Sequence, residues 1–156
     1  MPRINIPRLA RSVPRRSGSG TGSAPVSVTA GTLVGSGIIT GATTIGTGSG
    51  TGAFLSLAAG TTVRATLTIQ NALIFNADAT YTYTFRAMRN SISTDQVIAN
   101  GVSINGGATI ALISHNRGAL NQGTVLTLIS TSANPISGHF SNLADGNIVT
   151  INGNNF

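Results

Sequence analysis

The sequence predicts an all-β protein whose short strands stack as the coils of a solenoid. Lysine and glutamate are absent and charged residues make up only 8% of the chain. The chain therefore has almost none of the charged residues that form the solvent-exposed face of an amphipathic helix. Threonine, valine and isoleucine are abundant and favour strands, while glycine and asparagine supply turns between them. An internal repeat then favours stacked coils over the alternative fold, a β-sandwich.

The chain divides by composition into a leader and a body. Residues 1–16 contain five arginines and no acid, and residues 17–24 (SGSGTGSA) have the composition of a flexible linker. From residue 17 onward there are four arginines and three aspartates, so the body carries a net charge of only +1. We therefore expect a disordered basic leader over 1–24 and a β-solenoid segment over 25–156, and the overall charge of +6 describes mainly the leader.

Within the body, short apolar and threonine-rich runs separated by glycine or asparagine predict the strands. They lie at 26–28, 32–34, 38–40, 43–45, 53–55, 61–69, 73–75, 80–87, 96–98, 102–104, 109–113, 124–130, 136–140 and 148–151. Alternation is clearest where Tyr81, Tyr83 and Phe85 interleave with threonines, which places the aromatic rings on one face of the strand. Strand length and spacing alone suit a sandwich or a solenoid equally.

An internal repeat favours the solenoid over the sandwich. Residues 73–83 (LIFNADATYTY) align with residues 102–112 (VSINGGATIAL), and a third, partial copy (VTING) begins at residue 149. The asparagine that follows each apolar pair suits a corner, and asparagines in stacked coils form hydrogen-bonded ladders. At about 20–25 residues per turn the body would make about five to six coils.

From residue 31 onward, the chain resembles the C-terminal part of bacterial proteins built from autotransporter-associated β-strand, passenger-type repeats. The segments that carry the resemblance are GTLVGSG at 31–37, GTGSGTG at 46–52, ATLTI at 65–69, FNADATY at 75–81, DQVIANGV at 95–102 and GHFSNL at 138–143. The resemblance implies a single-stranded right-handed parallel β-helix outside the cell, within a much larger polypeptide. It also implies a secreted or surface location for a structural or adhesive passenger segment.

The sequence departs from that family at several points. Relatives often have proline in the segment that reads AFLSLAAG at 53–60, and they run on past the position of Phe156. No signal peptide is visible in residues 1–16, and no apolar run is long enough to span a membrane. We therefore expect the solenoid to continue beyond this chain, with the export signal elsewhere in a longer parent protein.

Few residues suit catalysis or ligand binding. The three aspartates, Asp78, Asp95 and Asp145, are widely spread, so paired carboxylates are not expected and we predict no enzyme activity. The only local charged cluster in the sequence contains Arg86, Arg89 and Asp95. It indicates either a solvated loop or a loop that contacts carbohydrate. Tyr81 and Tyr83 would stack on sugars if they face outward, and would pack in the core if they face inward.

Cofactors and metals are not expected. The chain has no cysteine, and His115 and His139 stand apart from each other and from carboxylates, as surface histidines do. The glycine-rich run at 46–52 is not followed by a helix, so it indicates a solenoid corner and not a dinucleotide site.

The sequence is compatible with three classes of function. The first is a non-catalytic passenger segment that contacts glycans or other cell-surface components. The second is a polysaccharide-binding or polysaccharide-degrading β-helix protein. The third is binding of phosphate or anionic lipid through the arginine-rich leader, without the interleaved aromatic residues of a specific nucleic-acid surface.

Overall fold

The computed structural model describes residues 23–50, 52–57, 64–88, 91–115, 123–143, 150–151 and 154–155. Within these ranges every regular element is a β-strand, which confirms the all-β prediction. Residues 1–22 of the expected leader (1–24) lie outside the described residues, and the first described strand begins at Val26. No described helix is long and apolar enough to cross a membrane.

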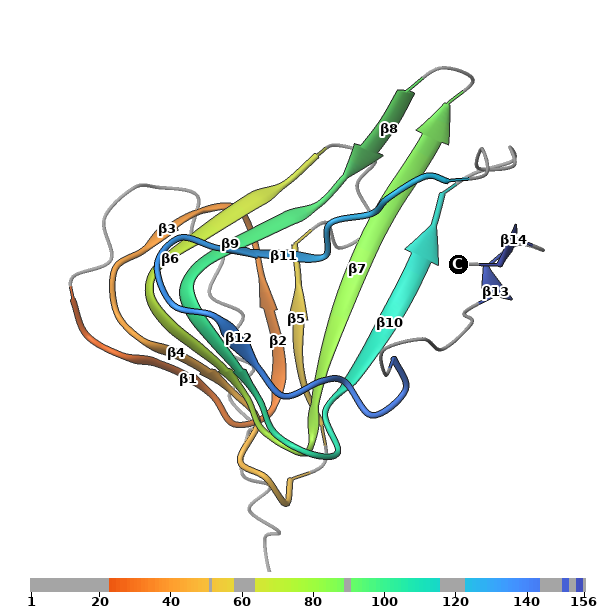
Figure 1. The fold of residues 1–156 in the computed structure, drawn as a ribbon. Helices are drawn as coiled ribbons and strands as arrows, with labels where there is room; N and C mark the ends of the chain where they lie inside the picture. Colours follow the sequence, from red (N-terminus) through yellow and green to blue (C-terminus); the bar gives the residue numbers. More distant parts are fainter. Residues whose placement is uncertain are drawn as a thin grey trace, which may run out of the picture.

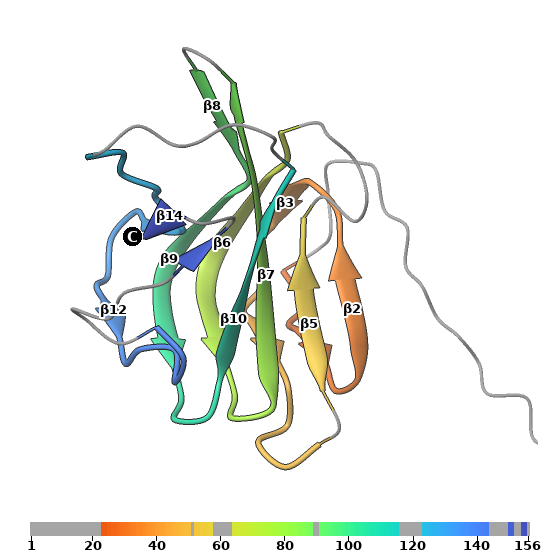
Figure 2. The ribbon, with the colours of Figure 1, turned by 90° about the vertical axis from the view of Figure 1, so that its right-hand side faces the viewer.

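Two sheets face each other and form most of the molecule (Figure 1). Sheet A comprises β1 (Val26–Val28), β3 (Gly37–Ile39), β4 (Thr43–Ile45), β6 (Thr66–Phe75), β9 (Gln96–Ile104), β11 (Ile129–Thr131) and β12 (Ile136–Ser137). Sheet B comprises β2 (Gly31–Val34), β5 (Ala53–Ser56), β7 (Ala79–Met88), β8 (Ser91–Thr94) and β10 (Thr109–Ser114), and Figure 2 shows β10, β7, β5 and β2 side by side. A separate antiparallel pair contains β13 (Thr150–Ile151) and β14 (Asn154–Asn155).

Each sheet grows in sequence order as the chain passes between them. The strands of sheet A follow the order β1-β4-β6-β9-β11, and those of sheet B follow β2-β5-β7-β10. All pairs in sheet A are parallel, and in sheet B only β8 pairs antiparallel, with β7. Parallel pairing between successive passes differs from the antiparallel pairing of a sandwich and is consistent with the predicted solenoid.

The register confirms the alignment of the first two repeat copies. Phe75 pairs with Ile104 in sheet A, and Thr80 pairs with Thr109 in sheet B. The aligned residues therefore lie directly beside one another on neighbouring strands. The third copy behaves differently: its Thr150–Ile151 lies in β13 and pairs with β14, and the rest lies outside the described residues. The strand that pairs with Val102 on its far side is β12, through Ile136.

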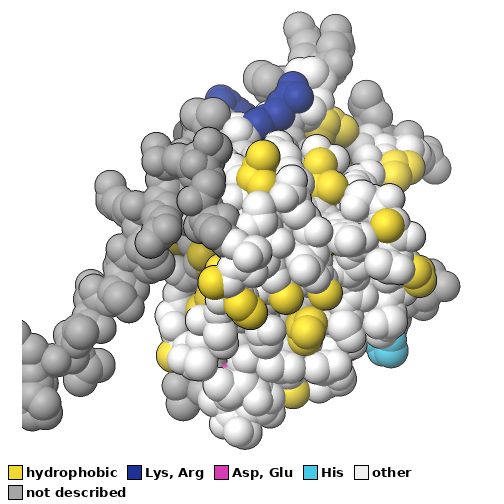
Figure 3. Space-filling view, turned by 90° about the vertical axis from the view of Figure 1, so that its left-hand side faces the viewer, with side chains coloured by type: hydrophobic (Ala, Val, Ile, Leu, Met, Phe, Trp, Pro, Cys, Tyr) yellow, Lys and Arg dark blue, Asp and Glu magenta, His cyan; other side chains and the backbone are white. Residues whose placement is uncertain are grey.

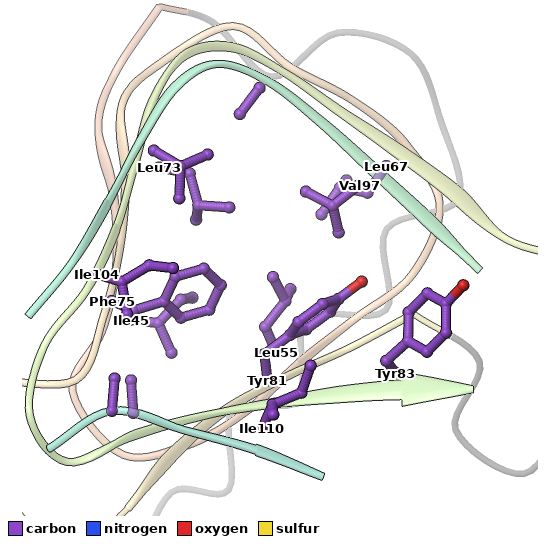
Figure 4. Close-up of a cluster of buried hydrophobic side chains, with 14 of the residues drawn as sticks. Ile45, Leu55, Leu67, Leu73, Phe75, Tyr81, Tyr83, Val97, Ile104 and Ile110 are labelled. Carbon is purple, nitrogen blue, oxygen red and sulfur yellow. The ribbon is translucent and has the colours of Figure 1, made fainter. Parts of the chain in front are cut away.

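The core fills the space between the sheets with rows of apolar side chains (Figure 4). Ile45, Phe75 and Ile104 form one row, because the second residue pairs with both of the others. Facing them are Leu55, Tyr81 and Ile110 from sheet B. Alternation explains both rows, since residues two apart in a strand point to the same face.

Asparagines at the corner after β6 and β9 form the predicted ladder. Asn105 Nδ2 donates to Asn76 Oδ1 at 2.8 Å, and Asn76 Nδ2 donates to the Gly46 carbonyl at 2.8 Å. The ladder thus ties together three successive passes of the chain. It also satisfies a backbone carbonyl at a turn, where no strand partner exists.

The outer edge of β10 is covered by a side chain where no further strand is described. The Asn142 amide accepts a hydrogen bond from the Ile110 N–H at 2.9 Å and donates to the Ile110 carbonyl at 2.8 Å. The Ser141 N–H donates to the neighbouring Ala108 carbonyl at 2.8 Å. These bonds satisfy backbone groups that an open sheet edge would leave unpaired.

Candidate functional site

The two tyrosines predicted as possible ligand contacts lie in the core. Tyr81 and Tyr83 are each 0% exposed, and their rings pack edge to face with centroids 6.2 Å apart. The Tyr81 hydroxyl donates to the Leu128 carbonyl at 3.0 Å, and the Tyr83 hydroxyl donates to the Thr127 carbonyl at 3.3 Å. Burial raises the pKa of both phenols. Both rings therefore point into the core, and the alternative in which they face outward and stack on sugars is contradicted.

Arg86 lies on a hairpin that projects from the body. Strands β7 and β8 pair antiparallel from Phe85 and Thr94 outward, and the pair extends beyond the stacked strands (Figures 1 and 2). Arg86 is exposed and pairs directly with Ser93 across this ribbon. Arg89, the second arginine of the predicted cluster, lies outside the described residues.

A third arginine, which the sequence pattern did not single out, reaches the same position. Arg64 precedes β6 and is exposed, and its Nε donates to Ser93 Oγ at 3.0 Å. Arg64 and Arg86 are 22 positions apart in sequence, so only the folded arrangement brings both to Ser93. No spacing rule in the sequence identifies this convergence.

Asp95 belongs to the base of the hairpin and not to its surface. It is 2% exposed, and its Oδ1 accepts a hydrogen bond from the Ala65 N–H at 3.2 Å. Its Oδ2 is buried without a hydrogen-bond partner among the described residues. Burial raises the pKa of Asp95, and the Ala65 amide, the Thr84 hydroxyl and the His115 ring oppose that rise. No ion pair joins Asp95 to Arg64 or Arg86 in the described part of the chain, so the predicted arginine–aspartate cluster is not one surface site.

Asp78 organises the glycine-rich corner at 46–50. Its carboxylate accepts hydrogen bonds from the Gly48 N–H at 2.6 Å, the Gly50 N–H at 3.1 Å and the Thr47 N–H at 3.2 Å. The Gly48 amide is the largest cause that lowers the pKa of Asp78. Desolvation, the second-largest cause, raises it, and the amides of Thr47, Asp78 and Gly50 lower it further. Three converging amides form an anion-binding concavity, and here the protein's own carboxylate fills it.

Sequence reasoning missed this role of Asp78, although a signal existed. In the repeat alignment Asp78 stands where the second copy has Gly107. A side chain at Gly46 would collide with the carboxylate, and a Cβ at Gly50 would come within 2.6 Å of Asp78 Oδ2. The glycines are therefore required for close approach, and the run is a corner as predicted.

Both histidines lie on the surface, as predicted. His115 and His139 are exposed, and the His115 backbone N–H donates to the Phe85 carbonyl at 3.0 Å. Among the described residues no group of three histidine or acidic side chains is placed to hold a metal ion.

The outer face of sheet A is almost free of charge (Figure 3). The arginine side chains gather at the end of this face from which the hairpin projects, and neutral polar groups and scattered apolar side chains cover the rest. On the outer side of sheet B, the Thr80 and Thr109 hydroxyls hydrogen-bond to each other at 2.9 Å. This face of sheet A is therefore nearly uncharged over most of its area and carries positive charge at one end.

No protein family, curated protein or solved structure was found to match the chain.

Proposed function

We propose that residues 25–156 form a single-stranded right-handed parallel β-helix of about five to six coils, and that it serves as a non-catalytic structural or adhesive passenger segment of a secreted or surface-displayed bacterial protein. One observation carries the proposal: successive passes of the chain stack in parallel and in register, as Phe75 and Ile104 do. Such stacking builds a rod whose length grows with the number of repeats. A rod of this kind holds other segments away from a surface.

The chemistry of the surface supports a role outside the cell. Exposed groups that titrate are few, and Asp78 already accepts hydrogen bonds from three backbone amides. A surface of hydroxyls and amides changes little with salt or pH. Contacts from such a surface to glycans or other cell-surface components are weak individually and gain strength through repetition along a longer parent protein.

The placement of the acids supports a non-catalytic role. Polysaccharide hydrolysis requires two carboxyl groups that flank the scissile bond. Asp78 is bound to the glycine-rich corner, while Asp95 is buried at the base of the hairpin and accepts a hydrogen bond from Ala65. Among the described residues, neither carboxylate is presented with a partner acid to a substrate, and Asp145 lies outside those residues.

The register of the stack is tested by engineered disulfides, because the natural chain contains no cysteine. Thr80 and Thr109 pair directly, so Thr80→Cys with Thr109→Cys should oxidise to a disulfide, which needs Cα atoms about 4.4–6.8 Å apart. The matched control is Thr80→Cys with Ala111→Cys, since Ala111 pairs with Thr82 and lies two residues out of register. Equal cross-linking in both variants would contradict the stack.

Display is tested by fusing the chain to an outer-membrane barrel in a bacterial host. The proposal expects an epitope within the chain to be removed by protease added to intact cells, and expects displaying cells to adhere to a glycan-coated surface. A Phe75→Asp variant, which places a charge in the core, should lose display and adhesion. A folded wild-type chain that stays inside the cell or fails to promote adhesion would overturn the proposed function.

A further inference from the structure

Two arginines converge on one serine at the base of the projecting hairpin. Arg86 is the direct cross-strand partner of Ser93, so their side chains share one face of the ribbon with Cβ atoms about 4.5–5.5 Å apart. Arg64 reaches the same serine from the segment before β6, with Nε 3.0 Å from Ser93 Oγ. One guanidinium group is therefore bound to the Ser93 hydroxyl, and a second arginine side chain leaves the ribbon from the same face beside it.

No described acid neutralises this pair. Asp95 is buried and its Oδ1 accepts a hydrogen bond from Ala65, while Asp78 is held by the glycine-rich corner. Residues 85–94 contain no acid, and they include a further arginine, Arg89, outside the described residues. Like charges brought together without a counter-charge repel each other, so an anion at this position would relieve a cost that the described residues leave uncompensated.

We propose that Arg64, Ser93 and Arg86 form an anion-binding site that takes sulfate or carboxylate groups of an acidic polysaccharide. The inference rests on the proposed adhesive function and names the class of glycan it recognises. Each guanidinium presents several N–H donors in a planar fork that matches the oxygens of sulfate and carboxylate groups. The Ser93 hydroxyl, which accepts from Arg64, keeps its own proton to donate to the ligand.

The position of the site favours a linear polymer. Both arginines are exposed, and the dark-blue side chains in Figure 3 lie at the end of an otherwise nearly uncharged face, from which the ribbon of β7 and β8 projects (Figure 1). A polymer with anionic groups repeated along its length would place one group at this site and continue past the ribbon. Its binding would strengthen as sites repeat along a parent protein.

The experiment must separate this site from the basic leader, which also attracts polyanions. The background is therefore the full chain in which Arg3, Arg8, Arg11, Arg15 and Arg16 are replaced by serine. Heparin binding of this background is compared with that of its Arg64→Gln/Arg86→Gln derivative over a range of salt concentrations. Thr109→Ala, on the outer side of sheet B, is the matched control, and thermal unfolding verifies that each variant is folded.

We expect the double variant to bind heparin at least about tenfold more weakly, since charge-assisted hydrogen bonds are lost, with a shallower salt dependence. Thr109→Ala should bind heparin as tightly as the background does. Arg64→Lys/Arg86→Lys should recover part of the affinity, because lysine restores the positive charge but not the planar set of guanidinium N–H donors. Unchanged heparin binding in the folded double variant would overturn the site. Arginine-dependent binding to phosphatidylglycerol vesicles in place of heparin would overturn the ligand class. Neither result alters the disulfide and display tests, so the two proposals fail separately.

Discussion

Asn105 donates its side-chain amide to the Asn76 oxygen at 2.8 Å, across 29 positions of sequence. Asn76 in turn donates to the Gly46 carbonyl one pass earlier, so each asparagine is bound to the preceding pass of the chain. A hydrogen-bonded corner of this kind fixes the register of the apolar rows beside it. A shift by one residue would break the ladder and turn every inward side chain outward.

The first prediction concerns the unequal weight of the two asparagines. Asn76→Ala removes two hydrogen bonds and Asn105→Ala removes one, so we expect losses of about 1–3 and about 0.5–1.5 kcal/mol in the free energy of unfolding. Urea denaturation followed by circular dichroism measures both. Asn71→Ala is the control, because the Asn71 side chain accepts a hydrogen bond from the adjacent Ala72 N–H and, among the described residues, links no other pass of the chain. Equal effects at all three positions would contradict a ladder that links successive passes.

The second prediction concerns Asp78 and acid. The amides of the glycine-rich corner lower the pKa of Asp78 below its usual 3.8, so its stabilising effect is complete above that pH and disappears as pH falls through the lower folded value. Asp78→Asn places an NH₂ group against amide donors and should lower the Tm at neutral pH by on the order of a few °C. Thermal unfolding of wild type and variant should converge in strong acid. A constant difference at every pH would show that the carboxylate charge is irrelevant.

The third prediction has the opposite sign and concerns Asp95. Burial raises the pKa of Asp95 above its usual 3.8, so the ionised form destabilises the fold at neutral pH, and this cost is relieved as pH falls through the raised value. Asp95→Asn keeps an oxygen for the Ala65 amide and removes the buried charge. Its Tm should exceed that of wild type at neutral pH by about 2–4 °C for each kcal/mol gained, and the excess should shrink in acid. A variant less stable than wild type at neutral pH would mean that the charge has a favourable partner.

The fourth prediction compares two phenylalanines that differ in burial. Phe75 is 0% exposed and packs edge to face against Phe140 with centroids 5.4 Å apart, whereas Phe54 is 38% exposed on the outer side of sheet B. Phe75→Ala should cost about 3–5 kcal/mol through lost burial and a cavity, and Phe54→Ala should cost less than half as much. The free energies of unfolding from urea titrations test this, and comparable losses would place the core elsewhere.

The sequence by itself determined the strand-forming character, the placement of the aromatic rings on one face of their strand and the alignment of residues 73–83 with 102–112. These are local properties: alternation assigns side chains to faces, and a repeat places like residues at like positions in neighbouring passes. For the same reason the Asn76–Asn105 ladder was predictable from two asparagines in equivalent positions. That the aromatic face points inward came from the structure.

Only the tertiary structure decided the contacts and the burial of residues outside the repeat. The convergence of Arg64 and Arg86 on Ser93 depends on where a hairpin leaves the stack, and the burial of Asp95 depends on what covers the base of that hairpin. The Asn142 amide at the edge of β10 depends on a loop path that no periodicity encodes. Each arises from contacts between segments far apart in sequence, where solvation and charge are set by the packed neighbours and not by the residue types alone.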